Sequence, residues 1–304
     1  MANTASKEME NQKLIMKKMM AAGFAPKFDG SMDLLHLRSI VQAAQERMPT
    51  EPGVEFLPRT YGGIEAEISM PEGAKDDYIV VYIHGGGLIC GNAFSSRGYA
   101  SMLAGESKHP VISFSYRLAP EYPFPAAVED CFAAYQDILV EFPDKPIYLI
   151  GESGGGYLCI TTVMKCRDNG VKLPTAIVPY SPPIELFGVL NRNFEGNEDF
   201  VVTPDTLTKS LCGQYLMAED QGNIYAEPYY DDFHGFCPVF IAWDENETLS
   251  VDCNVIVERL KKQGSEVEYL SYPHCFHAFA TTGRGTPESY EIMKNTINFF
   301  EAHK

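Results

Sequence analysis

Six short apolar runs, separated by segments with helical patterning, constrain the fold of this chain more than any other feature. Strands that alternate with helices are typical of βαβ units, which build a buried and mostly parallel sheet. Two further stretches, residues 54–57 and 61–70, alternate apolar and polar side chains as antiparallel strands do. The sequence therefore predicts an α/β fold with a central sheet flanked by helices. The six runs cover residues 78–84, 111–116, 146–151, 175–180, 238–243 and 267–272.

Two parts of the chain stand outside this alternation. Residues 7–22 and 33–48 have the spacing of amphipathic helices. Between Tyr180 and Cys237 lie more than 50 residues, too many for an ordinary crossover, and residues 205–217 within them look helical. Insertions at the carboxyl ends of parallel strands lie over the crevice where such sheets bind ligands. We therefore expect N-terminal cap helices in 1–50, a first part of the core in 51–182, a cap insertion in 183–220 and a second part of the core in 221–304.

Charge and composition exclude several classes of partner. The formal net charge of −17 argues against nucleic acid, because phosphate binding needs clustered Lys and Arg, and against stable association with anionic membranes. No run approaches the roughly 20 apolar residues of a membrane helix, and the N-terminus has no secretory signal. The eight cysteines show neither CxxC nor His/Cys ligand spacing. We expect a reduced, cytoplasmic protein without a metal or cofactor.

Residues 151–155, Gly-Glu-Ser-Gly-Gly, match the pattern G-x-S-x-G between the predicted strand 146–151 and a predicted helix over 156–165. In a nucleophile elbow the serine lies on such a strand-to-helix turn, and the glycines relieve crowding around its backbone. The alternative is a glycine-rich turn without chemistry, because the bare pattern is common. The context favours Ser153 as a nucleophile.

Residues 84–87, His-Gly-Gly-Gly, follow directly on the predicted strand 78–84. Glycines allow backbone amides to approach a substrate oxygen, and with the amide of Gly154 they would form an oxyanion hole, worth roughly 3 kcal/mol of barrier per donor. A simple turn is the alternative. A dinucleotide site is disfavoured, because no G-x-G-x-x-G opens a helix here.

A serine nucleophile also needs a base, which in turn needs an orienting acid. His277 follows the last predicted strand, at the same edge of the sheet as Ser153, and His274 competes with it. Four carboxylates follow the strand 238–243, and the pattern alone leaves open which of them, if any, does chemistry. They are Asp244, Glu245, Glu247 and Asp252.

Together these motifs have the order and spacing of one family. The chain resembles the hormone-sensitive-lipase-like branch of the α/β-hydrolases, the bacterial family IV carboxylesterases, from about residue 54 to its C-terminus. The block Tyr-Arg-Leu-Ala-Pro-Glu at 116–121 is the most specific element, because nothing in triad chemistry demands it. The resemblance implies an α/β-hydrolase fold with a helical cap. By position it also implies Ser153 as nucleophile, His277 as base, and Gly86, Gly87 and Gly154 as the oxyanion hole.

The resemblance also selects the acid. The family places an aspartate in an Asp-Pro-Leu-x-Asp segment, and alignment without a gap sets Glu247 at that position. Asp244 is the alternative, because it lies nearer the strand end and could reach if the loop is tighter. Asp252 is expected to face solvent inside a helix that Ser250 caps.

The implied function is a serine carboxylesterase that acts on small or medium esters through an acyl-enzyme on Ser153. Leu88 and Tyr157 depart from the family's usual aromatic residue and asparagine, which leaves substrate preference open. The alternatives are a serine peptidase or amidase of the same fold, and a non-catalytic hydrolase-like protein that binds a ligand. The sequence also leaves the oligomeric state open, with a homodimer as one alternative.

Overall fold

The centre of the protein is one eight-stranded sheet with the strand order β1-β2-β4-β3-β5-β6-β7-β8. The computed structural model describes residues 4–28, 32–204, 206–207 and 213–304. Strands β3 to β8 pair in parallel, whereas β2 is antiparallel to both β1 and β4. The predicted, mostly parallel sheet is therefore confirmed. The strands are β1 Val54–Tyr61, β2 Ile64–Pro71, β3 Ile79–Ile83, β4 Val111–Phe114, β5 Ile147–Glu152, β6 Ala176–Tyr180, β7 Val239–Asp244 and β8 Val267–Tyr272.

The first strand is longer than the sequence predicts. It continues to Tyr61, which pairs with Ile64 across a turn at Gly62 and Gly63, both with positive φ. The prediction of a strand that begins at Tyr61 was therefore wrong. The pattern misled because Pro58 interrupts it, and an edge strand tolerates a proline that a central strand would not.

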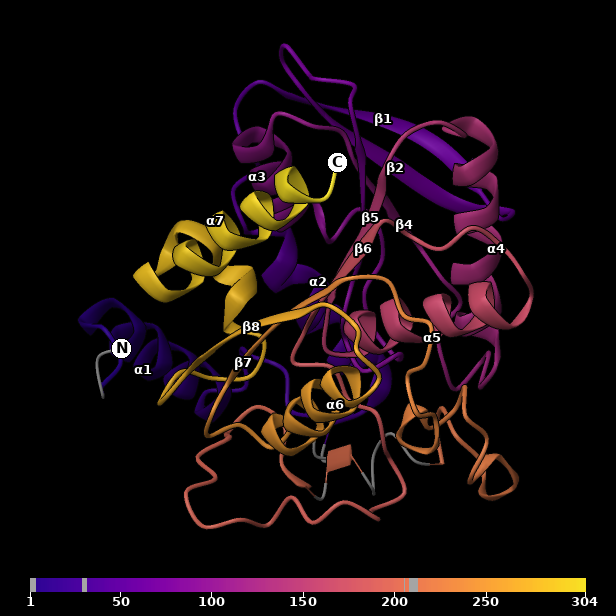
Figure 1. Ribbon diagram of the computed structural model, residues 1–304. Helices are drawn as coiled ribbons and strands as arrows, with labels where there is room; N and C mark the ends of the chain where they lie inside the picture. Colours follow the sequence, from indigo (N-terminus) through magenta and orange to yellow (C-terminus); the bar gives the residue numbers. More distant parts are fainter. Residues whose placement is uncertain (1–3, 29–31, 205, 208–212) are drawn as a thin grey trace.

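Helices cover both faces of the sheet (Figure 1). One apolar cluster joins the sheet to α3 and α7, and the other joins it to α4, α5 and α6. The inner strands β3, β6 and β7 are buried along their whole length because both of their faces are covered. The helices are α1 Lys7–Ala21, α2 Leu34–Glu46, α3 Arg97–Ser107, α4 Ala126–Glu141, α5 Gly154–Asp168, α6 Ser250–Lys262 and α7 Pro287–Ala302.

The two N-terminal helices contact loops at the carboxyl ends of the strands. Met9 of α1 is fully buried in the cluster with α7, and Lys13 Nζ donates to the carbonyl oxygen of His274 at 2.7 Å. Arg38 of α2 donates to the carbonyl oxygens of Ile89 and Ala119 at 2.7 and 2.8 Å. Both helices are thus tied to segments that follow parallel strands.

The described residues of the long interval after β6 lie mostly at the bottom of Figure 1. Residues 205 and 208–212 of the predicted helix 205–217 lie outside the described residues, and residues 213–217 form a turn and a bridge, so the prediction of a helix was wrong there. Further along, Asp252 was expected to face solvent, and this prediction was wrong. Asp252 is fully buried, because its carboxylate accepts from Arg192 Nε at 2.8 Å and from Ile184 N at 2.9 Å. Ser250 does not cap α6 either, since it is the first helical residue.

Within the residues that the structure describes, no helix is both long and apolar enough to cross a bilayer.

Candidate active site

Ser153 lies on a strained turn between β5 and α5. Its φ is 53°, in the left-handed region that costs a side-chain-bearing residue energy, and its N–H donates to the carbonyl oxygen of Tyr180 at 2.8 Å. A Cβ on Gly151 would lie 2.6 Å from the carbonyl oxygen of Ile83, so the neighbouring strand leaves no room for a side chain there. The turn holds Ser153 at the carboxyl edge of the sheet, as the elbow motif predicts.

The glycine-rich loop after β3 lies against this turn. Gly86 and Gly87 both have positive φ, and a Cβ on Gly154 would lie 3.3 Å from the amide nitrogen of Leu88. Within the described part of the chain, the backbone N–H groups of Gly86, Gly87 and Gly154 donate to no protein acceptor. Three amides near Ser153 are thus free to bind an oxygen that gains negative charge.

Two stacked aromatic rings, those of His84 and Tyr116, lie at the start of that loop. The ring of His84 is buried and stacks on Tyr116, with centroids 4.2 Å apart. The Tyr116 hydroxyl also donates to the carbonyl oxygen of His84 at 2.9 Å. Burial lowers the pKa of His84 to about 4, so this ring is neutral at neutral pH. Tyr116 is the first residue of the block at 116–121, so these contacts explain why that block begins with a tyrosine.

His277 and Glu247 form a buried pair at the same edge. Their closest atoms, Nδ1 and Oε2, are 3.3 Å apart, and the two side chains are 5% and 0% exposed. In the described structure neither ring nitrogen of His277 completes a hydrogen bond to protein. Nε2 is therefore open to a serine hydroxyl, as a general base requires.

Charges around the pair change its protonation. Burial is the largest effect on the pKa of His277 and lowers it, but the contact with Glu247 and the nearby negative charges together outweigh burial, so the pKa is raised above its ordinary value. Asp199 and Glu152 act in the same direction as Glu247. Burial raises the pKa of Glu247, and the contact with His277 opposes that rise.

The competing residues lie elsewhere. His274 has a half-exposed ring whose Nδ1 is 3.1 Å from Glu198 Oε2. Asp244 is buried, accepts from the backbone N–H groups of Asn246 and Cys275, and has its pKa raised to about 7 by burial. The structure therefore brings Glu247, and neither Asp244 nor Asp252, to His277.

Residues 80–281 match a family model described as the α/β-hydrolase fold. The chain belongs to this family. An acetyl-hydrolase of Streptomyces hygroscopicus is 31% identical over 223 residues, which are 72% of this chain and 74% of that protein. A hormone-sensitive lipase of Mus musculus is 40% identical over 137 residues, 43% of this chain and 17% of that much longer protein.

A solved structure described as an esterase of the bacterial hormone-sensitive lipase family superposes on this α/β-hydrolase with a TM-score of 0.89, at 26% identity and 99% coverage of both chains. The predicted fold and the resemblance to hormone-sensitive lipases are therefore confirmed. The same relatives confirm the predicted enzyme class, a carboxylic ester hydrolase.

Leu88 and Tyr157, two of the departures from the family pattern, are buried in this α/β-hydrolase. Leu88 lies against Gly154, next to the free amides. The hydroxyl of Tyr157 donates to the carbonyl oxygen of Tyr225 at 2.5 Å and lies 3.4 Å from that of Tyr215. Tyr157 thus ties α5 to the segments that follow β6.

Sequence reasoning missed one residue beside the pair. Ser181 follows β6 with a φ of 46°, is buried, and has a side chain that lowers the pKa of Glu247. Only its place directly after a predicted strand, at the edge that also carries Ser153, could have drawn attention to it.

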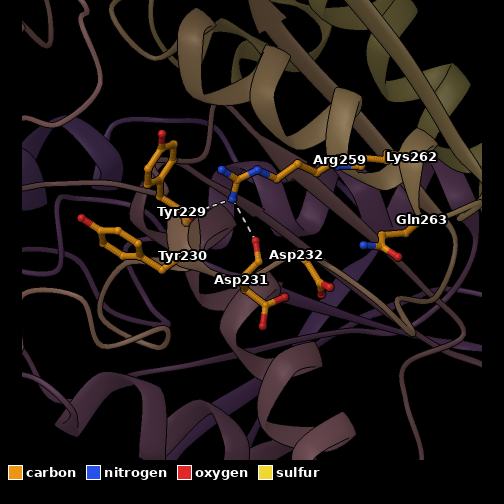
Figure 2. A pocket seen from close by; sticks show the side chains of 7 residues that line it. All are labelled: Tyr229, Tyr230, Asp231, Asp232, Arg259, Lys262 and Gln263. Carbon is orange, nitrogen blue, oxygen red and sulfur yellow. Dashed lines mark hydrogen bonds between the residues drawn. The ribbon is translucent and has the colours of Figure 1, made fainter.

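A surface pocket of the α/β-hydrolase lies away from these residues (Figure 2). Its volume is about 330 Å³, and Arg259 spans it by donating to the carbonyl oxygens of Tyr229 and Asp231. Arg259 lies nine residues into α6, about 14 Å along the helix from the end that follows Glu247. The pocket is therefore separate from the candidate active site. Its lining residues are Tyr229, Tyr230, Asp231, Asp232, Arg259, Lys262 and Gln263.

Among the described residues, one group has the spacing of metal ligands, and it adjoins this pocket. It consists of Asp231, Asp232 and His234, whose ligand atoms lie within 4.8 Å of one another. These side chains already have partners, since Asp231 pairs with Arg167 at 2.7 Å and Asp232 with His234 at 2.6 Å. The group is better explained as an ion-pair network than as a metal site.

Proposed function

We propose that the protein is a serine carboxylesterase that hydrolyses small to medium acyl esters through an acyl-enzyme on Ser153. One observation carries the proposal: the buried contact between His277 and Glu247, at the edge of the sheet that also holds the strained turn of Ser153. An acid, a base and a nucleophile so arranged have the roles of a hydrolase triad.

The proposed reaction has two balanced steps. His277 takes the proton of Ser153 as the hydroxyl oxygen attacks the ester carbonyl, and the amides of Gly86, Gly87 and Gly154 bind the resulting oxyanion. The alcohol leaves with the proton from His277. Water then attacks the acyl-enzyme, with His277 again as base, and His277 returns that proton to Ser153 Oγ as the bond to the acyl group breaks and the carboxylic acid departs. Glu247 orients the imidazole and stabilises its charged form.

We also propose that residues 1–50 and 183–220 form a cap over the core segments 51–182 and 221–304. The contacts of Lys13 and Arg38 with loops after the strands support this division. So does the approach of the Tyr157 and Tyr215 hydroxyls to 3.4 Å, which joins α5 of the core to the insertion. A cap set over the site limits the space for the acyl chain, in line with small or medium esters.

A homodimer and a cytoplasmic location stay predictions. Sedimentation equilibrium and cell fractionation test them separately.

The test of the mechanism is Ser153→Ala, with Ser265→Ala at a turn after α6 as the control. With p-nitrophenyl acetate the unchanged enzyme should give a burst and a covalent acetyl group on Ser153, detected by mass spectrometry. Ser153→Ala should lose roughly 10⁴-fold or more in turnover while still binding substrate. Near-normal turnover in this variant would overturn the proposal. Faster cleavage of an aminoacyl anilide than of the ester would favour the peptidase alternative.

A further inference from the structure

One short segment after β6 is hydrogen-bonded to the loop after β7, which carries the proposed acid, and to the loop after β8, which carries the proposed base. Asn246 is the centre of this contact: its Nδ2 donates to the carbonyl oxygen of Gly196 at 2.8 Å, and its Oδ1 accepts from His274 N at 2.9 Å. Its own carbonyl oxygen accepts from Glu198 N at 2.8 Å. Hydrogen bonds of Asn246 therefore join residues 196–202 to the loops that follow β7 and β8. We call these seven residues the clamp segment.

Asp199 is the charged residue at the core of the clamp segment. Its Oδ1 accepts from the backbone N–H groups of Val201 and Val202, at 2.8 and 2.9 Å. Its Oδ2 accepts from Thr248 N at 3.0 Å, and the Thr248 hydroxyl returns a bond to the carbonyl oxygen of Val202. Three N–H donors thus fix the orientation of this carboxylate. One of them belongs to the residue directly after Glu247.

The negative charge of Asp199 also reaches the proposed triad. It raises the pKa of His277 and that of Glu247, in each case as a smaller effect than burial and the contact between the pair. The other charged groups that act on His277 are Glu247 and Glu152. Asp244 faces Glu247 from the same turn, and Asp199 raises its pKa as well.

We propose that Asp199 is a positioning residue for ester hydrolysis, which anchors the Glu247 loop to the clamp segment and holds a fixed negative charge near His277. The proposal rests on the proposed roles of Glu247 and His277. When His277 takes the serine proton it becomes an imidazolium, and a nearby fixed carboxylate stabilises that cation. A contact from the insertion would thus favour the charge that forms during acylation and deacylation.

The experiment compares Asp199→Asn with Glu198→Gln, using the pH dependence of kcat/KM for a neutral ester. Asparagine keeps an oxygen for the N–H groups of Val201 and Val202 but removes the charge. The base must be neutral, so activity falls as pH drops through the pKa of His277. Without the charge of Asp199, the acidic limb of the kcat/KM–pH profile should move to lower pH by roughly half a unit, and kcat should fall several-fold. Glu198→Gln removes an equal charge from the neighbouring residue, next to half-exposed His274, and should leave the limb in place.

Two further variants separate charge from shape. Asp199→Glu keeps the charge and should retain the limb of the unchanged enzyme, even if kcat falls because the longer side chain disturbs the three N–H bonds. If Asp199→Asn does not fold, Asp199→Ser removes the same charge and is measured instead. If Asp199→Asn has lower activity at every pH but an acidic limb at the same pH as the unchanged enzyme, Asp199 has only a structural role and the proposal is wrong. Equal shifts in the Asp199 and Glu198 variants would also overturn it, because they would show only the effect of net charge.

The titration of His277 can also be followed by NMR in the Ser153→Ala background. This readout does not depend on turnover. A shift there without any ester hydrolysis by the unchanged protein would refute the proposed function and leave the electrostatic role of Asp199 standing.

Discussion

Asp244, the last residue of β7, and Glu247, in the turn that follows, are both buried acids, yet their partners differ. Asp244 accepts two backbone N–H bonds, which help to fold the turn and fix the loop after β8. Both oxygens of Glu247 lack a completed hydrogen bond in the described structure, and Oε2 lies 3.3 Å from Nδ1 of His277. A carboxylate that the backbone does not satisfy is the one available to orient an imidazole.

We predict that Glu247→Gln lowers kcat by roughly 10³- to 10⁴-fold and leaves folding nearly intact, because an amide cannot stabilise the imidazolium. The matched control is Asp244→Asn, whose amide oxygen can still accept from Asn246 and Cys275. It should lose far less activity. Steady-state kinetics with thermal unfolding of each variant decide the matter. If Asp244→Asn loses most of its kcat while Glu247→Gln keeps its activity, Asp244 is the triad acid.

Glu152, next to the nucleophile, gives a prediction about stability and pH. Burial raises its pKa from 4.5 to about 7, although its Oε1 accepts from Gly85 N at 2.7 Å. Between these two values the folded protein holds a proton that the unfolded chain has released. The free energy of unfolding must therefore fall as pH rises from 4.5 to 7, by roughly 3 kcal/mol for this group.

Glu152→Gln should remove that dependence, since glutamine does not titrate and can still accept from Gly85. Urea unfolding at pH 5, 6 and 7 measures the difference in slope between this variant and the unchanged protein. The exposed Glu268→Gln controls for the loss of one negative charge. Equal slopes in all three proteins would mean that Glu152 is not protonated in this window.

At the scale of the elements, α1 shows how the N-terminal segment is attached. Met9 is fully buried, whereas Leu14 and Ile15 are 51% and 53% exposed. Ser6 caps the helix and also donates to Glu288 of α7 at 2.8 Å. One face of α1 thus belongs to the core, and the opposite face is open.

We predict that deletion of residues 1–23 exposes apolar surface and broadens the acyl-chain preference, because the contacts of Met9 and Lys13 are lost together. Binding of a hydrophobic dye and kcat/KM for esters of increasing acyl length provide the measurements. The double substitution Leu14→Gln/Ile15→Gln changes only the open face, so it should keep the original profile. An unchanged profile after the deletion would contradict the cap.

The sequence could predict elements whose apolar period is unbroken, such as β3 and the last helix. The pair Thr286-Pro287 is typical of a helix start, and Thr286 does cap α7, accepting from Ser289 N at 3.2 Å, with Pro287 as its first residue. Ser153, His277 and Glu247 could be predicted because each follows a recognisable strand within a family motif. The burial of Asp252 could not, because it depends on Arg192, sixty positions earlier in a segment without periodicity. The contacts of Asp199 are beyond sequence reasoning for the same reason.

For the whole molecule, the net charge of −17 acts on any charged substrate. Asp199 and Glu247 add negative charge beside His277 in the candidate active site. An anionic ester is therefore repelled at long range by the net charge and within the site by these carboxylates.

We predict that kcat/KM for a singly anionic ester rises roughly two- to tenfold between 10 and 300 mM NaCl, because salt screens this repulsion. A neutral ester of matched size serves as the control and should change little. Identical salt responses for the two esters would show that the acidic surface does not select against anions.

The hydrogen bonds between the clamp segment and residues Asn246 and Thr248 determine which parts of this enzyme can be exchanged with those of a relative. Residues 183–220 are one continuous insertion, which suggests that they could be exchanged alone. Their contacts with the turn after β7 mean that the two segments have to be exchanged together. A chimera that imports a foreign insertion alone would receive it without the matching Asn246 and Thr248. Designers who want a new acyl preference should therefore transplant residues 183–220 and 244–249 from the same parent.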